Sequence, residues 1–479
     1  MAYSAAAHPL KTVFFLALFV RLINLAFLAG NESFFTERDA FVYWGIGTGL
    51  ARPESFWSTL LTETDRLPLY PLLLGGIQHF FGDAPRVVAM LQAVIDAGTC
   101  ALIGALGALI SPRVGLIAGI LATLSVTLIV SSTQILTETL FLFFFTLMLL
   151  GAGRFLLHPK NGLAILAGLA GGVALATRSA IAPLLAAGVP VVFIVVLVQR
   201  RTFAAALIAA MLFAVCGAAA IAPVWLRNVI HYGSFSLTSQ TGDHLALWIV
   251  PLVTQRANAT PYQTTVERMA SLYQDRAQAT LCAPRKLDCR AEQDLNAQTN
   301  PFERAAIKSD VARQEMAHLP ASAYAMAWLE GMVVNLAAPA LITDPRVRAL
   351  PKPSFYNTPG ATLWEKTRAY LLDNLGAYQI LLMIGLVTML PFLGLQLVGF
   401  IMLMRTLPWA ALLAGGILIY FLLLNGPVAT PKYRLPMEPV LIVLSAIPLA
   451  RMKFRSTETH DITGAVSAKG VQDVPTSFS

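Results

Sequence analysis

Two short runs between the first two apolar segments contain residues that could divide a group-transfer reaction between them. The runs are Arg38-Asp39-Ala40-Phe41-Val42-Tyr43 and Arg66-Leu67-Pro68-Leu69-Tyr70-Pro71. A carboxylate can accept the proton of an attacking hydroxyl, and a guanidinium can bind a phosphate through its planar fork of N–H donors. The pattern predicts group transfer at a membrane face, with Asp39 as the general base and Glu37 as its rival.

Other ionisable residues fall at the predicted outer ends of apolar segments or in outer connections. The candidate phosphate-binding cations are Arg66, Arg178, Arg227, Lys432 and Arg434. The alternative for each cation is that it extends to the membrane surface without binding anything. Glu138 is expected at membrane depth, where a carboxylate is either a catalytic group or the partner of a cation such as Arg178.

The composition describes the elements that must position these residues. The 479 residues are 56% hydrophobic and 13% charged, and the mean hydropathy is +0.66. These values exclude an ordinary soluble domain and predict an all-α polytopic membrane protein. Spans are expected near 10–30, 85–110, 114–132, 134–154, 162–178, 180–199, 202–224, 376–404, 407–425 and 437–452. The segment 321–342 is interrupted by Glu330, and we expect it to be interfacial or re-entrant.

The net charge of +8 is explained by topology rather than by nucleic-acid binding. Basic residues recur in every second connection, as expected for connections on the inner side. They are Arg113; Arg154, His158 and Lys160; Arg200 and Arg201; Arg405; and Arg451, Lys453 and Arg455. Both termini are therefore expected in the cytoplasm, and the mixed-charge loops are expected outside.

Four regions follow from this topology. Residues 1–225 would form a catalytic membrane module whose outer loop, 31–84, contains two interfacial helices at 39–50 and 69–81. Residues 226–375 would form an outer region with helices of its own. Residues 376–455 would return the chain through the membrane, and the polar tail 456–479 is predicted to be disordered.

The outer region contains a cysteine pair, Cys282 and Cys289, separated by six residues. This spacing closes easily into a disulfide on an oxidising side of the membrane, and from sequence the pair could be either bridged or free. Paired CxxC motifs, an HExxH motif and a first-loop DxD pair are all missing from the sequence, so no metal is expected. A Gly-rich phosphate loop is missing as well, and no cofactor is expected.

The order of several short motifs resembles the membrane glycosyltransferases of the GT-C fold. The motifs are Asp39-x-x-x-Tyr43, Arg66-x-Pro-Leu-Tyr-Pro, Thr137-Glu138-Thr139-Leu140-Phe141, Thr177-Arg178, Trp225-Leu226-Arg227-Asn228-x-x-x-x-Gly233 and Tyr433-Arg434-Leu435-Pro436-x-Glu438-Pro439. Within that fold they are most similar to the branch of protein O-mannosyltransferases and bacterial aminoarabinose and galacturonic acid transferases. The family's first loop often has Asp-Glu where this chain has Asp39-Ala40.

The resemblance implies a bundle of about 10 to 12 membrane helices and an inverting transfer without metal. The donor would be a polyprenyl-phosphate-linked sugar, and the acceptor would be a glycolipid, a polysaccharide or a protein. The reaction would take place on the outer side of a bacterial inner membrane. Positions that would orient the substrate are Tyr43, Tyr70, Asn228, Tyr433 and Glu438.

Two other functional classes fit a chain with many spans. A flippase or other transporter of lipid-linked saccharides is expected to show an internal repeat with matching broken spans, and the sequence shows neither. A polysaccharide polymerase or ligase is expected to place its key Arg and His in a large late loop, whereas the best chemistry here lies in the first loop. A structural subunit would tolerate the loss of Asp39.

Overall fold

A computed structural model describes residues 7–28, 35, 39–199, 202–287, 289, 292–355, 357–360, 362–373 and 375–452. Every regular element in these ranges is a helix, so the predicted all-α class is confirmed. The predictions for Glu37, for Arg200 and Arg201, for Lys453 and Arg455, and for the tail 456–479 fall outside the described residues.

The apolar helices follow the predicted spans closely. They are α2 (Ala7–Phe27), α6 (Pro85–Ala108), α7 (Pro112–Leu124), α8 (Val126–Thr133), α9 (Glu138–Leu157), α10 (Asn161–Leu175), α11 (Ala182–Val198), α12 (Phe203–Ala219), α13 (Ala222–Tyr232), α22 (Ala377–Thr406), α23 (Pro408–Asn425) and α24 (Glu438–Arg451). In the described part, seven spans are long and apolar enough to cross a membrane, or up to nine if each bent pair is one span. The chain is a polytopic membrane protein.

Two of the predicted spans are bent, and one helix is short. The chain turns by 50° between α7 and α8 and by 61° between α12 and α13. Ser125 lies at the first bend and caps the N-terminus of α8, because its hydroxyl accepts a hydrogen bond from the backbone N–H of Leu128. Pro223 lies in the first turn of α13, where its missing N–H ends the preceding hydrogen-bond ladder. At 15 residues, α10 is shorter than the bilayer core requires.

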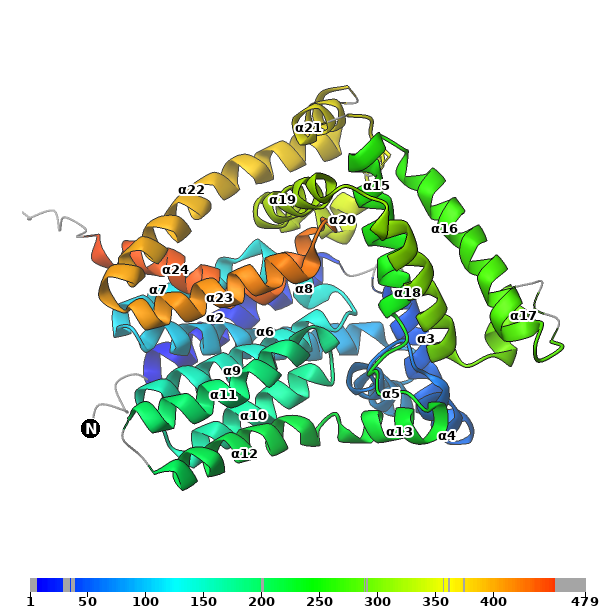
Figure 1. The fold of residues 1–479 in the computed structure, drawn as a ribbon. Coiled ribbons are helices and arrows are strands. Elements are labelled where there is room, and N and C mark those ends of the chain that lie inside the picture. The colour runs from blue at the N-terminus through cyan, green and yellow to red at the C-terminus, as the bar shows by residue number, and fades with distance from the viewer. Residues whose placement is uncertain are drawn as a thin grey trace, which may run out of the picture.

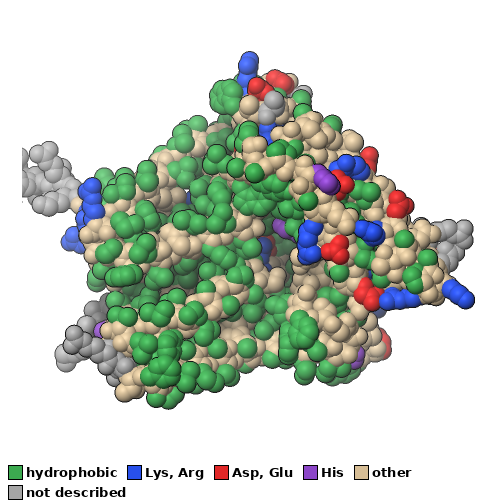
Figure 2. Space-filling view, in the orientation of Figure 1, with side chains coloured by type: hydrophobic (Ala, Val, Ile, Leu, Met, Phe, Trp, Pro, Cys, Tyr) green, Lys and Arg blue, Asp and Glu red, His purple; other side chains and the backbone are tan. Residues whose placement is uncertain are grey.

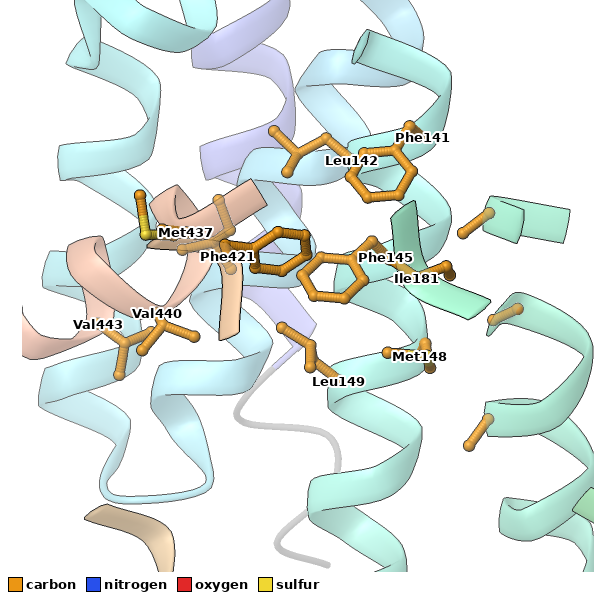
Figure 3. Packing of buried hydrophobic residues seen from close by; sticks show 14 of the residues in the cluster. Phe141, Leu142, Phe145, Met148, Leu149, Ile181, Phe421, Met437, Val440 and Val443 are labelled. Atoms are coloured by element: carbon orange, nitrogen blue, oxygen red, sulfur yellow. The ribbon is translucent and has the colours of Figure 1, made fainter. Parts of the chain in front are cut away.

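The bundle core positions the start of α9 (Figure 3). The Phe145 ring stacks on Phe141 with ring centres 5.4 Å apart, and it meets Phe421 of α23 edge to face at 5.6 Å. Met437 and Val440, from the last segment of the chain, belong to the same buried cluster. These contacts hold the end of α9 that bears Glu138 against the last two apolar segments.

Small residues allow α10 and α12 to approach closely. A Cβ on Gly172 would lie 2.4 Å from the carbonyl oxygen of Gly217, and a Cβ on Gly168 would lie 2.5 Å from that of Phe213. Neither position has room for a side chain, because the two backbones touch. Close contact of this kind favours helix association in a membrane, where burying apolar surface gives little advantage.

The loop after α2 is helical. It contains α3 (Asp39–Ala51), α4 (Pro53–Thr62) and α5 (Leu69–Phe81). The two helices expected from sequence correspond to α3 and α5, while α4 was not predicted. The α3 and α5 backbones cross at Gly47 and Gly75, since a Cβ on Gly47 would lie 2.8 Å from Leu74 and a Cβ on Gly75 would lie 2.8 Å from Leu50.

Residues 226–375, named the cap region here, lie beside one end of the bundle (Figure 1). Beyond α13, their elements are α14 (Thr241–His244), η3 (Leu245–Ile249), α15 (Val250–Asn258), α16 (Tyr262–Ala277), η4 (Gln278–Cys282), α17 (Glu292–Gln298), α18 (Pro301–Ala317), α19 (Ala321–Ala337), η5 (Ala340–Thr343), α20 (Pro345–Arg348) and α21 (Leu363–Leu372). Cys282 and Cys289 form a disulfide within it. The start of α2 and the end of α24 lie at the end of the bundle away from the cap (Figure 1).

Candidate functional site

Asp39 and Lys432 meet although 393 positions separate them in the sequence. Asp39 is the first residue of α3, where the helix dipole favours a carboxylate, and Lys432 lies in η6 (Pro431–Met437). The Lys432 Nζ donates a hydrogen bond to Asp39 Oδ2 at 3.1 Å. The Lys432 side chain is 32% exposed and the Asp39 side chain is 50% exposed, so a ligand can reach this pair.

Arg66 approaches the same place from the connection before α5. Its guanidinium carbon lies 5.5 Å from the centre of the Tyr43 ring, and Tyr43 is one helical turn from Asp39. The Tyr43 ring meets Tyr70 edge to face at 5.5 Å. The Arg66 Nε is buried and has no hydrogen-bond partner among the described residues. A buried N–H of this kind is a donor available to a bound anion.

Glu138 and Arg178 form a second ion pair, 2.7 Å from Nη1 to Oε1. Glu138 begins α9 and its side chain is 7% exposed, while that of Arg178 is 20% exposed. The Arg178 guanidinium lies 5.7 Å from the centre of the Phe141 ring, so the aromatic core also orients it. This pairing is the structural alternative that the sequence left open for Glu138, and it directs Arg178 toward the first pair.

Electrostatics join the two pairs into one cluster. Burial acts to raise the pKa of Asp39, but the positive charges of Lys432, Arg66 and Arg178 together lower that pKa below its usual value. Burial raises the pKa of Tyr43, which also feels the charges of Glu138 and Asp39. The group Asp39, Arg66, Glu138, Arg178 and Lys432, named the Asp39 cluster here, has three cations and two carboxylates.

A series of hydrogen bonds connects Tyr70, which contacts Tyr43, to Gln92 of α6 and to the end of α8. The Tyr70 hydroxyl donates to Gln92 Oε1 at 2.7 Å, and burial raises the pKa of Tyr70 well above its usual value. Gln92 Nε2 donates to the backbone oxygens of Ser132 and Gln134 at 3.0 and 2.8 Å. The sequence analysis missed Gln92, although an amide inside an apolar segment is a signal that could have identified it.

Tyr433 lies beside the cluster. The Lys432 Nζ is 6.0 Å from the centre of the Tyr433 ring, and the Tyr433 carbonyl accepts a hydrogen bond from Asn425. The ring is therefore placed to contact a molecule bound at Lys432.

The structure assigns Arg434 and Glu438 to the protein interior. The Arg434 Nε pairs with Glu438 at 2.7 Å, both side chains are at most 5% exposed, and Arg434 also donates to the carbonyl of Leu336. Arg434 is only two residues from Lys432, but the three-residue turn of η6 sends the two side chains in different directions. Arg434 is thus held by an internal ion pair in this structure, and its contact with phosphate stays a prediction.

Arg227 and Asn228 also donate hydrogen bonds to backbone carbonyls. Arg227 Nη1 donates to the carbonyls of Leu60 and Glu63 at 2.8 and 2.6 Å. Asn228, which is fully buried, donates to the carbonyl of Ser236 at 2.8 Å. Arg227 thus ties α13 to the first loop, while Asn228 ties α13 to the segment that follows it, and these contacts do not place either residue in the Asp39 cluster.

The molecular surface is hollowed between the bundle and the cap, and charged side chains are visible in the hollow (Figure 2). Within the described residues, no group of three or more His, Cys, Asp or Glu side chains is arranged to hold a metal ion. The Asp39 cluster itself provides two carboxylates and three cations, and Tyr43 lies beside it.

The sequence and the structure were compared with known protein families, curated proteins and solved structures. No family model and no curated protein matches this sequence. Among solved structures, the chain is similar to ArnT from Cupriavidus metallidurans bound to undecaprenyl phosphate, with 14% sequence identity and a TM-score of 0.36. The match covers 92% of this chain and 76% of that chain.

Proposed function

We propose that this protein is a membrane glycosyltransferase of the GT-C type. It transfers a sugar from a polyprenyl-phosphate-linked donor to an acceptor hydroxyl. The observation that carries the proposal is the convergence of three cations on one half-exposed carboxylate, with Lys432 Nζ 3.1 Å from Asp39 Oδ2. Phosphate binding and proton transfer need these two kinds of group side by side.

The charges in the Asp39 cluster suit a phosphodiester. Two carboxylates leave one of the three cations uncompensated, and a lipid-linked sugar phosphate has one negative charge. The buried Arg66 Nε, which has no hydrogen-bond partner in the described part of the chain, would donate to the phosphate. Glu138 would keep Arg178 extended toward the phosphate and would not itself react.

Asp39 would be the general base. Because the neighbouring cations lower its pKa, its carboxylate is ionised at neutral pH and can accept a proton. Phosphate binding would give Lys432 a second anionic partner and release one oxygen of Asp39. The acceptor oxygen then attacks the anomeric carbon, its proton passes to Asp39, and the sugar configuration inverts.

The bond from the anomeric carbon to the phosphate oxygen breaks with its electron pair on the phosphate. The leaving group changes from a diester with one negative charge to a monoester with a second, developing charge. Arg66 and Lys432 would stabilise that charge in the transition state, where such electrostatic effects are largest. Tyr43 and Tyr433 would line the sugar.

The Cys282–Cys289 disulfide supports a cap region on an oxidising side of the membrane, such as a periplasm. The Asp39 cluster lies on the same side of the bundle as the cap. We place the reaction at the outer face of a bacterial inner membrane, with a glycolipid, a polysaccharide or a protein as the acceptor.

The test is a sugar-transfer assay with purified protein, a panel of radiolabelled polyprenyl-phosphate sugars and a membrane extract as acceptor. Asp39→Asn keeps the shape of the side chain and removes the base, so transfer should fall by about 10²- to 10⁴-fold. The matched control is Glu54→Gln, an exposed acid of α4 in the same loop, which should transfer at the wild-type rate.

Equal transfer by wild type and Asp39→Asn would show that Asp39 is not the base. No transfer by any variant, with donors that span the common sugars, would reject the glycosyltransferase. Donor movement across a vesicle bilayer would then be measured, because a flippase is the remaining class that binds the same lipid.

A further inference from the structure

Asn335 is a fully buried amide in α19, an otherwise largely apolar helix of the cap region. Its Nδ2 donates to the Val428 carbonyl at 3.0 Å, and its Oδ1 accepts from the Thr430 N–H at 3.0 Å. One side chain therefore binds the backbone at two places in the segment between α23 and η6. Lys432 of the Asp39 cluster lies two residues beyond Thr430.

Thr430 is also the residue from which the turn that carries Lys432 begins. The Thr430 carbonyl accepts a hydrogen bond from the Tyr433 N–H at 3.0 Å, which closes the first turn of η6 around Lys432. Asn335 thus fixes the N–H of Thr430, while the turn uses its carbonyl. A displacement of Thr430 would move the backbone of Lys432 with it.

The helix α19 holds the chain on both sides of Lys432. Asn335 binds Thr430 before Lys432, and the next residue of α19, Leu336, accepts a hydrogen bond from Arg434 after it. The Lys432 amine leaves this segment toward α3, where it meets Asp39. A helix of the cap region therefore supports the backbone from which a cation reaches the Asp39 cluster.

An amide suits this place because it has a donor and an acceptor and carries no charge. An apolar side chain of the same size would leave the Val428 carbonyl and the Thr430 N–H without the partners that they have here. A polar group that loses its partner in the protein interior must be desolvated without compensation, so the segment would shift to restore its hydrogen bonds.

We infer that Asn335 is a positioning residue for the proposed transfer and acts on the donor phosphate through Lys432. It holds the start of η6 in the place from which the Lys432 amine can meet both Asp39 and the phosphate. The role in transfer rests on the proposed function, whereas the hold on the segment 428–433 does not.

The first test needs no donor and compares amide hydrogen exchange in the segment 428–433 of the full-length protein. Asn335→Leu keeps the size of the side chain and removes both hydrogen bonds, so exchange in this segment should become faster. The matched control is Trp328→Phe, which removes the hydrogen bond of 3.1 Å from Trp328 Nε1 to the Leu423 carbonyl on the same helix. The control should leave exchange in 428–433 unchanged.

The second test measures the affinity for decaprenyl phosphate, the probe, in mixed micelles at constant ionic strength. Asn335→Leu should weaken this affinity by about tenfold, and by no more than Lys432→Met does, because it acts through Lys432. In the Lys432→Met background the same change should alter the affinity by less than about twofold. An equal loss in both backgrounds would overturn the inference, since it would mean that Asn335 does not act through Lys432.

The variant Asn335→Asp adds a pH profile that general destabilisation would not produce. The neutral carboxyl has the donor and the acceptor of the amide, whereas the ionised form has no donor and places a charge against the Val428 carbonyl. Burial should raise the pKa of the new carboxyl. The affinity should therefore be close to that of wild type at acidic pH and fall as the pH rises.

Wild type is measured at each pH, so that titration of the Asp39 cluster and of the phosphate affects both proteins. A ratio of the two affinities that stays constant with pH would overturn the positioning role. If wild type binds no decaprenyl phosphate while Asn335→Leu exchanges faster in 428–433, the proposed donor is rejected and the hold on the segment stands. If wild type and Asn335→Leu bind the probe equally, the positioning role is rejected and the proposed donor stands.

Discussion

The ion pairs Arg21–Asp96 and Asp39–Lys432 both join distant segments, but their surroundings differ. Arg21 and Asp96 are 0% and 1% exposed, and Nε meets Oδ2 at 2.7 Å. The other Arg21 nitrogens donate to Cys100 Sγ at 3.1 Å, to the Ala122 carbonyl at 3.1 Å and to the Thr123 carbonyl. Those carbonyls end α7, where the chain bends by 50°.

The Asp39–Lys432 pair is partly exposed, and the Asp39 cluster to which it belongs has one more cation than it has carboxylates. The protein itself uses the donors of Arg21, whereas the Asp39 cluster retains charge and an N–H for a ligand. The comparison teaches that a buried charge is not by itself a sign of function. What distinguishes the two regions is the state of the cation's donors: every nitrogen of Arg21 has an acceptor in the protein, whereas the buried Nε of Arg66 has none in the described part of the chain.

Arg21→Met should produce the largest effect. It leaves Asp96 as an unpaired buried acid and removes the donor of two carbonyls, so the free energy of unfolding should fall by about 3–5 kcal/mol. The measurement is denaturant unfolding in mixed micelles. The double variant Arg21→Met/Asp96→Leu should recover much of this loss, and an equal loss in Lys432→Met would break the comparison.

Lys366 combines features of both regions, since it is buried like Arg21 and faces a pocket. Its pKa is about 8 in the folded protein and 10.5 in the unfolded chain, so the folded state binds fewer protons between these values. The free energy of unfolding should therefore rise with pH from about 8 to 10.5, by at most about 3 kcal/mol. This gain is lost as the pH falls through 8.

The pH effect is read as the difference between wild type and Lys366→Met across that window. A difference in stability that stays flat from pH 7 to 10.5 would mean that Lys366 titrates normally.

Lys432→Met should weaken donor binding by about 10- to 100-fold, the effect of losing a charged hydrogen bond to phosphate. Its effect on the free energy of unfolding should stay below about 1 kcal/mol, because the pair with Asp39 is partly exposed. Donor KM and unfolding are measured on the same preparation. A large stability loss with unchanged KM would move Lys432 into the structural class of Arg21.

Arg227→Gln should have the smallest effect. Arg227 resembles Arg21 in binding backbone carbonyls, so its loss should lower the free energy of unfolding by about 1–2 kcal/mol and leave the donor KM unchanged. If KM rises instead and stability is kept, Arg227 is a phosphate ligand, as its position in the sequence suggested.

The sequence predicted those parts of the site that depend on local spacing and depth. Asp39 and Tyr43 share a helix face because they are four residues apart, and Glu138 pairs with Arg178, the cation named as its alternative partner from sequence. The helices α3 and α5 were also predicted, α3 because Asp39 and Tyr43 lie one helical turn apart and α5 because its surface is mostly apolar.

Contacts between distant segments could not be predicted in this way. Lys432 and Arg434 look equivalent in sequence, and only the direction imposed by η6 separates a cluster cation from an interior one. Arg256, Glu330 and Lys366 come from three helices of the cap, where each alone reads as a solvated charge. Their shared pocket depends on tertiary packing that no local pattern encodes.

The Arg21–Asp96 pair also affects how the chain is made. Asp96 follows Arg21 by 75 residues, so α2 enters the membrane before its partner exists. At roughly 5–20 residues per second, the ribosome needs about 4 to 15 seconds to complete that interval. During this time a lone arginine disfavours insertion by about 2.5–3.5 kcal/mol. The first span is thus held only weakly until α6 emerges, and the pairing of Arg21 with Asp96 then stabilises both helices in the bilayer.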